Sequence, residues 1–272
     1  MKIVVYIGTE HLRTDARLVS LTGELAAGGR EVILLEKDGC MPEDADMVLS
    51  LGGDGTFLSA AMMALRGGVP IAGVNMGRMG FLSENRAEDF AAALLSGEYK
   101  IEERAVLQAQ VHTGDPVIDE CPYALNEMTL RRSGAAMLGV DVCVDGVTLP
   151  TYWGDGIVIS TSSGSTAYSL SVGGPIALPE SKVFIISPIA PHNLNVRPLV
   201  VPDTSVISLQ ARSRDGHFEF SADNRTTEVE EQTFVEISMA QFSLKRLRLD
   251  KSNFIQALTE KLYWGEDVRN IR

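Results

Sequence analysis

The residues best placed for chemistry lie in a glycine-rich turn that follows the apolar segment Met47–Leu51. The sequence continues Gly-Gly-Asp-Gly-Thr, and a helix is predicted from Phe57. An apolar strand that leads through glycines into a helix exposes backbone N–H groups, and such groups bind phosphate. The predicted phosphate-binding residues are Gly52, Gly53, Gly55 and Thr56.

One carboxylate, that of Asp54, stands among these amides, where it would repel a phosphate. Three explanations are open from the sequence. The carboxylate can bridge to phosphate through Mg²⁺, accept a proton from a hydroxyl nucleophile, or cap the following helix. The first two explanations are functional and the third is structural.

Asn126 and Glu127 are polar neighbours within an otherwise apolar β segment. Polar groups of this kind are costly to bury unless something pairs with them, so they indicate a ligand. The structural alternative is a bulge or an exposed strand edge.

A run of hydroxylated and small residues follows a predicted apolar strand at 156–160. Residues 160–171 read STSSGSTAYSLS, and a short helical segment is predicted there. Hydroxyls and amides at the start of a helix suit the recognition of a nucleotide. The alternative is a flexible Ser/Gly linker, but linkers lack a flanking buried strand and a ring such as that of Tyr168.

Residues 77–81 carry a weaker signal. Gly77 and Gly80 let the backbone approach a ligand closely, and Phe81 offers a ring for stacking on a base. A glycine-containing turn before an aromatic core residue has the same pattern.

Composition and charge limit the classes of function. The chain has 272 residues and a net charge of −12, which argues against nucleic acids and anionic membranes as partners. No apolar run is as long as a membrane span and the N-terminus lacks a signal-peptide layout, so a cytoplasmic location is expected. Three widely spaced cysteines and four scattered histidines predict neither a disulfide framework nor a metal centre.

The periodicity predicts an α/β domain followed by a β-rich domain. Strands alternate with helices over residues 1–100, which is typical of a parallel sheet whose ligands bind at the carboxyl ends of its strands. Period-two patterns then predict mostly antiparallel, sandwich-like β structure over residues 101–249. A helix within residues 250–272, capped by Ser252 and closed by Trp264, is expected to return to the first domain. Three basic residues are interpreted as a solvated strand edge: Lys245, Arg246 and Arg248.

Taken in order, these clusters resemble the NAD kinases. The resemblance covers nearly the whole chain, from Met1 to about Trp264. Its first motif is shared with diacylglycerol and sphingosine kinases and related phosphofructokinases, whereas the stretch 155–175 is far more specific. The motifs are Gly-Gly-Asp-Gly-Thr at 52–56, Asn-Met-Gly-Arg-Met-Gly-Phe-Leu at 75–82, Asn-Glu at 126–127, Asp-Gly at 155–156, the run at 160–171 and Arg-Pro-Leu-Val at 197–200.

The resemblance implies that the chain phosphorylates the 2′-hydroxyl of the adenosine ribose of NAD, giving NADP, with Asp54 as the proton acceptor. Mg²⁺ or another divalent cation would arrive with the phosphoryl donor. The same resemblance implies a homodimer or homotetramer. The residues that it implies in NAD binding are Asp54, Gly55, Phe81, Asn126, Glu127, Asp155, Ser163, Thr166, Ala167, Tyr168, Ser169, Leu170, Ser171 and Ala190.

Two positions depart from the family pattern. Trp153 stands where several relatives have arginine near the 2′-phosphate, and Asn224 follows Asp223 where many members have Asp-Gly. Arg225 is therefore a candidate for contact with the product phosphate. ATP or polyphosphate as donor, and NAD or NADH as acceptor, stay open. Two other functions are a lipid or sphingoid kinase of the same superfamily and a non-catalytic NAD sensor.

Overall fold

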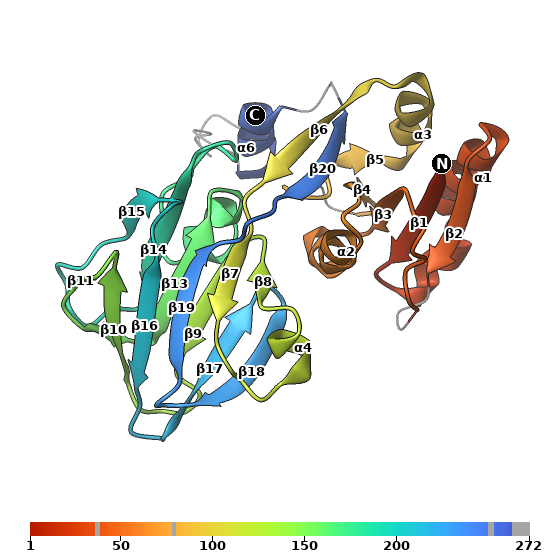
Figure 1. Cartoon of the computed structure of the whole chain (residues 1–272). Helices are drawn as coiled ribbons and strands as arrows, with labels where there is room; N and C mark the ends of the chain where they lie inside the picture. The colour runs from red at the N-terminus through yellow and green to blue at the C-terminus, as the bar shows by residue number, and fades with distance from the viewer. Residues whose placement is uncertain (36–38, 78–79, 250–252, 263–272) are drawn as a thin grey trace. The chain divides into compact units, whose positions relative to one another are not determined.

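The structure is a computed structural model that describes residues 1–35, 39–77, 80–249 and 253–262. The chain divides into two compact units. The first unit comprises Met1–Glu103 with Leu244–Arg272, and the second comprises Arg104–Ser243. Figure 1 shows the elements of each unit. The first unit is α/β and the second is almost entirely β, which confirms the predicted fold class.

The first unit is built on one sheet. Its strands are β1 (Lys2–Ile7), β2 (Glu31–Leu35), β3 (Met47–Leu51), β4 (Ile71–Asn75), β5 (Asn85–Arg86), β6 (Tyr99–Arg104) and β20 (Leu244–Leu249). They lie in the order β2-β1-β3-β4-β20-β6, and β5 pairs with β4. The pairs from β2 to β4 are parallel. Every residue of β3 is buried, which explains why this strand is apolar throughout rather than alternating.

The last strand of this sheet, β20, lies where the sequence pattern did not predict it. Residues 244–249 fall within the predicted β-rich domain 101–249, yet Arg246 pairs with Ile71 of β4. Leu247 and Leu249 belong to the core of the first unit. A strand of six residues carries no pattern that specifies which sheet it joins. The interpretation of a solvated basic edge is wrong for Arg246, which is 5% exposed.

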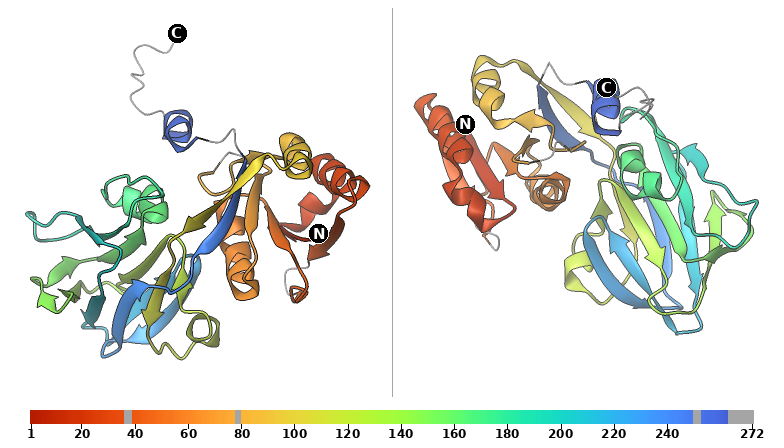
Figure 2. Two further views of the ribbon diagram at one scale, coloured as in Figure 1. Left: turned by 45° about the horizontal axis from the view of Figure 1, so that its top comes forward. Right: turned by 180° about the vertical axis from the view of Figure 1, so that it is seen from behind.

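Helices cover both faces of the first sheet. The helix α1 (Ala16–Ala27) packs beside α3 (Ala87–Ser96) on one face, as Figure 2 shows, and α2 (Asp54–Gly67) packs on β3 and β4. Asp15 caps α1 by accepting a hydrogen bond from the Arg17 amide at 2.9 Å. The short helix η1 (Glu10–Thr14) precedes α1. The leucines spaced three and four residues apart on α1 are buried: Leu18, Leu21 and Leu25.

The predicted C-terminal helix is present as α6 (Phe254–Leu262), and it belongs to the first unit. The predicted cap Ser252 and the predicted end Trp264 lie outside the described residues. Asn253 accepts hydrogen bonds from the amides at the start of this helix. No helix in the described part of the chain has the length and apolarity to cross a membrane.

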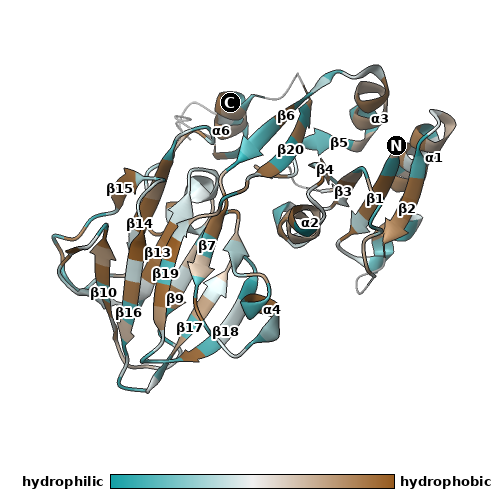
Figure 3. Ribbon diagram, viewed as in Figure 1, coloured by the Kyte–Doolittle hydropathy of each residue, from teal (hydrophilic) through white to brown (hydrophobic). Residues whose placement is uncertain are grey.

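The second unit consists of two antiparallel sheets that share one apolar core. Figure 3 shows hydrophobic residues recurring along the strands of both. One sheet has the order β11-β10-β16-β19-β7-β8, with β12 beside β10, and consists of β7 (Leu107–Gln110), β8 (Tyr123–Ala124), β10 (Leu138–Val144), β11 (Val147–Thr148), β12 (Tyr152–Gly154), β16 (Ile207–Arg212) and β19 (Phe234–Met239).

The other sheet has the order β15-β14-β13-β9-β17-β18. Its strands are β9 (Glu127–Arg131), β13 (Gly156–Thr161), β14 (Val183–Ile189), β15 (Leu199–Pro202), β17 (His217–Ala222) and β18 (Arg225–Glu230). Three short helical segments complete the described part of this unit: α4 (Pro116–Asp119), η2 (Ser163–Thr166) and α5 (Tyr168–Ser171). The predicted sandwich is therefore confirmed.

Candidate active site

Asp54 lies just after β3, as the first residue of α2, which begins at Asp54 rather than at the predicted Phe57. Its carboxylate accepts hydrogen bonds from three amides of the segment after β4. The Phe81 amide donates to Oδ2 at 2.9 Å, and the Leu82 and Ser83 amides donate to Oδ1 at 3.0 and 2.9 Å. The N-cap residue of α2 is Gly53. The helix-cap explanation of Asp54 is therefore wrong.

This arrangement explains what holds a carboxylate in a turn that also offers amides to a phosphate. The carboxylate is bound by the 81–83 amides, and hydrogen bonds to an ionised acceptor are strong. Gly53 and Gly55, at the start of α2, are exposed, and no atom lies within 4 Å of where a Cβ would stand on either. The backbone at this helix N-terminus is thus accessible to a phosphate.

The other two predicted phosphate-binding residues, Gly52 and Thr56, make contacts within the turn. A Cβ on Gly52 would lie 2.4 Å from Oγ1 of Thr56, and one on Gly8 would lie 2.2 Å from the same atom. The Gly52 amide donates to the Val74 carbonyl at 3.0 Å, so it is used within the sheet. The Thr56 side chain therefore packs inside the turn, and the prediction for Gly52 as an amide donor to phosphate is corrected.

Phe81, predicted to stack on adenine, already has two neighbours on its ring. Lys261 Nζ lies 4.6 Å from the ring centroid. The Phe254 ring lies 6.0 Å away, centroid to centroid, and is tilted by 49°. Contact of Phe81 with adenine stays a prediction.

In the second unit, Asn126 and Glu127 lie at the start of β9, against the hydroxyl-rich segment. The Thr161 amide donates to the Asn126 carbonyl at 2.9 Å, and a Cβ on Gly164 would lie 2.1 Å from that oxygen. The explanation of an exposed edge is wrong, because β9 lies between β13 and β17. Asn126 Oδ1 and Glu127 Oε2 are buried and lack a hydrogen-bond partner among the described residues. Buried polar atoms of this kind call for a hydrogen-bond partner from a ligand or from water.

Glu127 lies near a second carboxyl, that of Asp223. Burial and the charge of Asp223 raise the pKa of Glu127 to about 8. Asp223 has a φ of 52°, and its carboxylate accepts the amides of Leu125, Asn126 and Glu127 at 2.8, 2.8 and 3.3 Å. Burial also raises the pKa of Asp223, whereas these amides and Arg225 oppose that rise. Glu127 is therefore the carboxyl that keeps its proton near neutral pH.

The raised pKa of Glu127 predicts a pH-dependent stability. The pKa of Glu127 in the folded state is about 8, whereas its ordinary value is 4.5. Between these two values the folded state binds more protons than the unfolded state. The stabilisation is therefore lost progressively as the pH rises, and the loss is complete once the pH has passed 8. Between about pH 6 and pH 9, the unfolding temperature of the wild type is expected to fall by about 4 °C more than that of Glu127→Gln. Thermal unfolding followed by circular dichroism measures this difference.

The control for this experiment is Glu230→Gln, because the Glu230 side chain is exposed on β18. This variant is expected to keep the pH dependence of the wild type. Equal pH dependence in the wild type and Glu127→Gln would contradict the assignment of the proton to Glu127.

The residues of the hydroxyl-rich segment divide into two sets. Ser165 and Ser169 are buried. Ser165 Oγ donates to the Ala177 carbonyl at 3.1 Å, and Ser169 Oγ lies 3.2 Å from Ser187 Oγ. Ser169 therefore supports the segment from inside, which differs from its predicted place in the pocket lining. The predicted residues that are at least partly exposed are Ser163, Thr166, Ala167, Tyr168, Leu170 and Ser171.

Asp155 and Ala190 lie side by side at neighbouring strand ends. The Asp155 amide donates to the Ile189 carbonyl at 2.9 Å, and Ala190 is exposed with a φ of 43°. The Asp155 carboxylate pairs with Arg132 Nε at 2.7 Å. The structure thus brings together two of the residues that the resemblance implies in NAD binding.

Arg225, the candidate for the product phosphate, is held by the backbone. It donates to the Cys121 carbonyl at 2.6 Å and also to the Tyr123 carbonyl. Trp153 packs over Gly139, where a Cβ would lie 2.8 Å from the indole ring. We therefore do not carry Arg225 into the proposed site, because its guanidinium fixes the turn at 121–123.

Three side chains with a part in these clusters were missed from the sequence. Asp223 holds amides that lie 96 to 98 residues earlier in the chain. Arg246 and Lys261 contact the 80–82 segment from positions 164 to 181 residues later in the chain. Asp-Asn at 223–224 is a turn signal, but it does not reveal which amides the carboxylate holds.

Comparisons with known proteins match two successive parts of the chain. The ATP-NAD kinase N-terminal domain matches residues 33–99, and the ATP-NAD kinase C-terminal domain matches residues 125–249. An NAD kinase of Bacteroides fragilis is 43% identical over 230 residues, which cover 83% of this chain and 79% of the relative. An NAD kinase of Flavobacterium psychrophilum is 39% identical over 229 residues, covering 83% and 78%.

Two solved structures share the fold. An NAD kinase from Archaeoglobus fulgidus, in complex with ATP, is 26% identical with a TM-score of 0.78, covering 97% of this chain and 99% of that one. Yeast NADH kinase, complexed with NADH, is 19% identical with a TM-score of 0.83, covering 100% and 90%. The family models and the relatives identify the chain as a kinase. The chain belongs to the ATP-NAD kinase family.

Proposed function

We propose that this chain transfers the terminal phosphoryl group of ATP to the 2′-hydroxyl of the adenosine ribose of NAD, giving NADP and ADP. Membership of the ATP-NAD kinase family supports the substrates. The observation that carries the mechanism is the Asp54 carboxylate, which three amides hold beside the accessible backbone of Gly53 and Gly55.

Asp54 acts as the proton acceptor. As the ribose oxygen bonds to the γ-phosphorus and the bond to the leaving ADP breaks, the hydroxyl proton passes to the carboxylate. Oδ1 accepts two amides and Oδ2 accepts one. A carboxylate oxygen can accept more than one hydrogen bond, so Oδ2 is the atom with room for the hydroxyl.

The adenosine part of NAD is bound by Asn126 and Glu127. Asn126 Oδ1 and Glu127 Oε2 have no hydrogen-bond partner within the described residues. Adenosine supplies donors for Asn126 Oδ1 in its amino group and ribose hydroxyls, and it supplies acceptors for the proton of Glu127 in its ring nitrogens and ribose oxygens. The remaining contacts are those that the resemblance implies and that are accessible: Gly55, Phe81, Asp155, Ser163, Thr166, Ala167, Tyr168, Leu170, Ser171 and Ala190.

Mg²⁺ enters with the nucleotide as MgATP. The described residues contain no group of three His, Cys, Asp or Glu side chains suited to a metal ion. Mg²⁺ bound to the phosphoryl donor would offset the negative charge of the phosphates. Polyphosphate as an alternative donor, NADH as an alternative acceptor, the cytoplasmic location and a homodimer or homotetramer stay predictions from the resemblance.

NADP formation is measured by incubating the purified chain with MgATP and NAD and coupling the product to glucose-6-phosphate dehydrogenase. We expect NADP to form, and parallel reactions with polyphosphate and with NADH define donor and acceptor. Binding of NAD by calorimetry without NADP formation would instead indicate a sensor. Phosphorylation of diacylglycerol from labelled ATP, without NADP formation, would indicate a lipid kinase.

A further inference from the structure

The segment that holds Asp54 is itself held by α6. Lys261, near the end of this helix, donates from Nζ to the Gly80 carbonyl and lies 4.6 Å from the centroid of the Phe81 ring. Phe254, at the start of the helix, packs against the same ring at 6.0 Å. The two ends of α6 therefore contact Gly80 and Phe81. Phe81 is the first of the three residues whose amides bind Asp54.

A second cation holds the same segment from the sheet. Arg246 of β20 donates to the Phe81 and Leu82 carbonyls at 3.3 and 3.0 Å, and it pairs with Glu84 at 2.8 Å. The carbonyls of residues 80–82 are thus bound by cationic side chains, while the amides of residues 81–83 bind the Asp54 carboxylate. The backbone of residues 80–83 is therefore fixed on both sides, its carbonyls by the two cations and its amides by the carboxylate.

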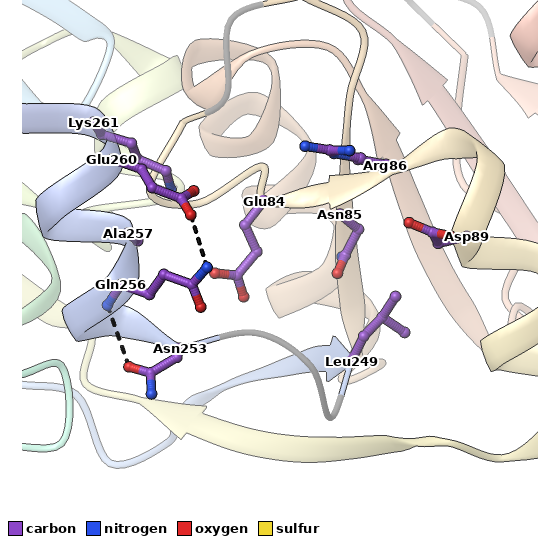
Figure 4. A pocket seen from close by; sticks show the side chains of 10 residues that line it. All are labelled: Glu84, Asn85, Arg86, Asp89, Leu249, Asn253, Gln256, Ala257, Glu260 and Lys261. Atoms are coloured by element: carbon purple, nitrogen blue, oxygen red, sulfur yellow. Dashed lines mark hydrogen bonds between the residues drawn. The ribbon is translucent and has the colours of Figure 1, made fainter.

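The surroundings of Lys261 are partly buried and charged. Burial lowers the pKa of Lys261, and the charges of Glu84, Asp54 and Glu260 oppose this while Arg246 adds to it. Lys261 and Glu84 line one cavity of 220 Å³, and Figure 4 shows their side chains at its edge.

We propose that Lys261 is a positioning residue for phosphoryl transfer, which fixes the 80–83 segment and through it the orientation of the Asp54 carboxylate. The inference rests on the proposed function, because the orientation of Asp54 matters to turnover only if Asp54 accepts the proton. A small displacement of a reacting group is enough to slow catalysis strongly. The contacts of Lys261 are with Gly80 and Phe81, so it acts through them.

The test compares Lys261→Met with Lys261→Arg and with the control Lys245→Met, since Lys245 is an exposed lysine on β20. For Lys261→Met we expect kcat to fall about tenfold or more while KM for NAD stays within about threefold. Lys261→Arg is expected to restore most of kcat, because it keeps the cation and the donor. Lys245→Met is expected to match the wild type.

Hydrogen exchange supplies a readout that does not depend on activity. The amides of residues 81–83 are expected to exchange about tenfold faster in Lys261→Met than in the wild type or Lys245→Met, because their acceptor is less well fixed. If Lys261→Met does not fold, the same comparison is made with Lys261→Gln, which keeps an N–H donor.

Unchanged exchange and unchanged kcat in Lys261→Met would overturn the proposal. A rise in KM with unchanged kcat would overturn it as well, because Lys261 would then support only a binding surface at Phe81. Failure of the proposed function is a different result: the wild type itself would form no NADP, whereas the exchange rates would still report on the contact between Lys261 and the 80–83 segment.

Discussion

Asp54→Asn is expected to lower kcat for NADP formation by about 10³-fold, while the dissociation constant for NAD changes by less than about threefold. The asparagine keeps the size of the side chain but is no longer a base. Turnover in the coupled assay and NAD binding by calorimetry measure the two quantities. The matched control is Asp89→Asn, an exposed aspartate on α3 of the same unit, which is expected to keep the activity of the wild type.

The same substitution has a structural cost that can be measured separately. The amide oxygen of asparagine can replace Oδ1 and accept the Leu82 and Ser83 amides, but its NH₂ group then faces the Phe81 amide, a donor against a donor. We expect the free energy of unfolding to fall by about 1–3 kcal/mol. Near-normal turnover in Asp54→Asn would remove Asp54 from the mechanism, whatever the change in stability.

Gly80→Ala is expected to reduce kcat by about 10²-fold or more without any change in the chemistry of the side chains that react. A Cβ on Gly80 would lie 1.9 Å from Oδ1 of Asp54 and 2.4 Å from its carboxyl carbon. The carboxylate or the 80–83 segment must therefore move, and either movement breaks the hydrogen bonds that orient Asp54. Steady-state kinetics and the exchange of the 81–83 amides measure the two effects.

The control for Gly80→Ala is Gly23→Ala in α1, where a Cβ would meet no atom within 4 Å. This variant is expected to keep full activity and to be slightly more stable, because alanine is the better helix former. Full activity in Gly80→Ala would mean that the position of the Asp54 carboxylate does not govern turnover.

Local patterns predict those parts of the fold that depend on neighbours in the sequence. Asp15 caps α1, and Leu18, Leu21 and Leu25 are buried on one face as their spacing indicates. The sequence also identifies Asp54 as a candidate site residue, because glycines around one carboxylate after a buried strand are a local feature. The start of α2 was placed too late, because glycines disfavour a helix in the interior but are tolerated in its first turn.

The parts that could not be predicted depend on contacts between distant segments. The sequence around Arg246 shows a basic, alternating strand, and only its pairing with β4 and Glu84 buries it. Asp223 is a turn residue by sequence, and only the fold brings it to the amides of 125–127. Ser165 and Ser169 are hydroxyls in a run of hydroxyls, and no periodicity separates those that face inward from those that stay accessible.

The position of β20 has a consequence for how the protein is made. The chain leaves the first unit after β6 and returns to the same sheet only with β20, beside β4 and β6. On the ribosome, the glycine turn is therefore synthesised long before Arg246 and Lys261, which steady its carboxylate. A nascent chain that has completed the second unit but not β20 and α6 already contains Asp54 and the 81–83 amides that bind it. It lacks Arg246 and Lys261, which bind the carbonyls of the same segment, so we expect phosphoryl transfer to begin only after α6 has been synthesised.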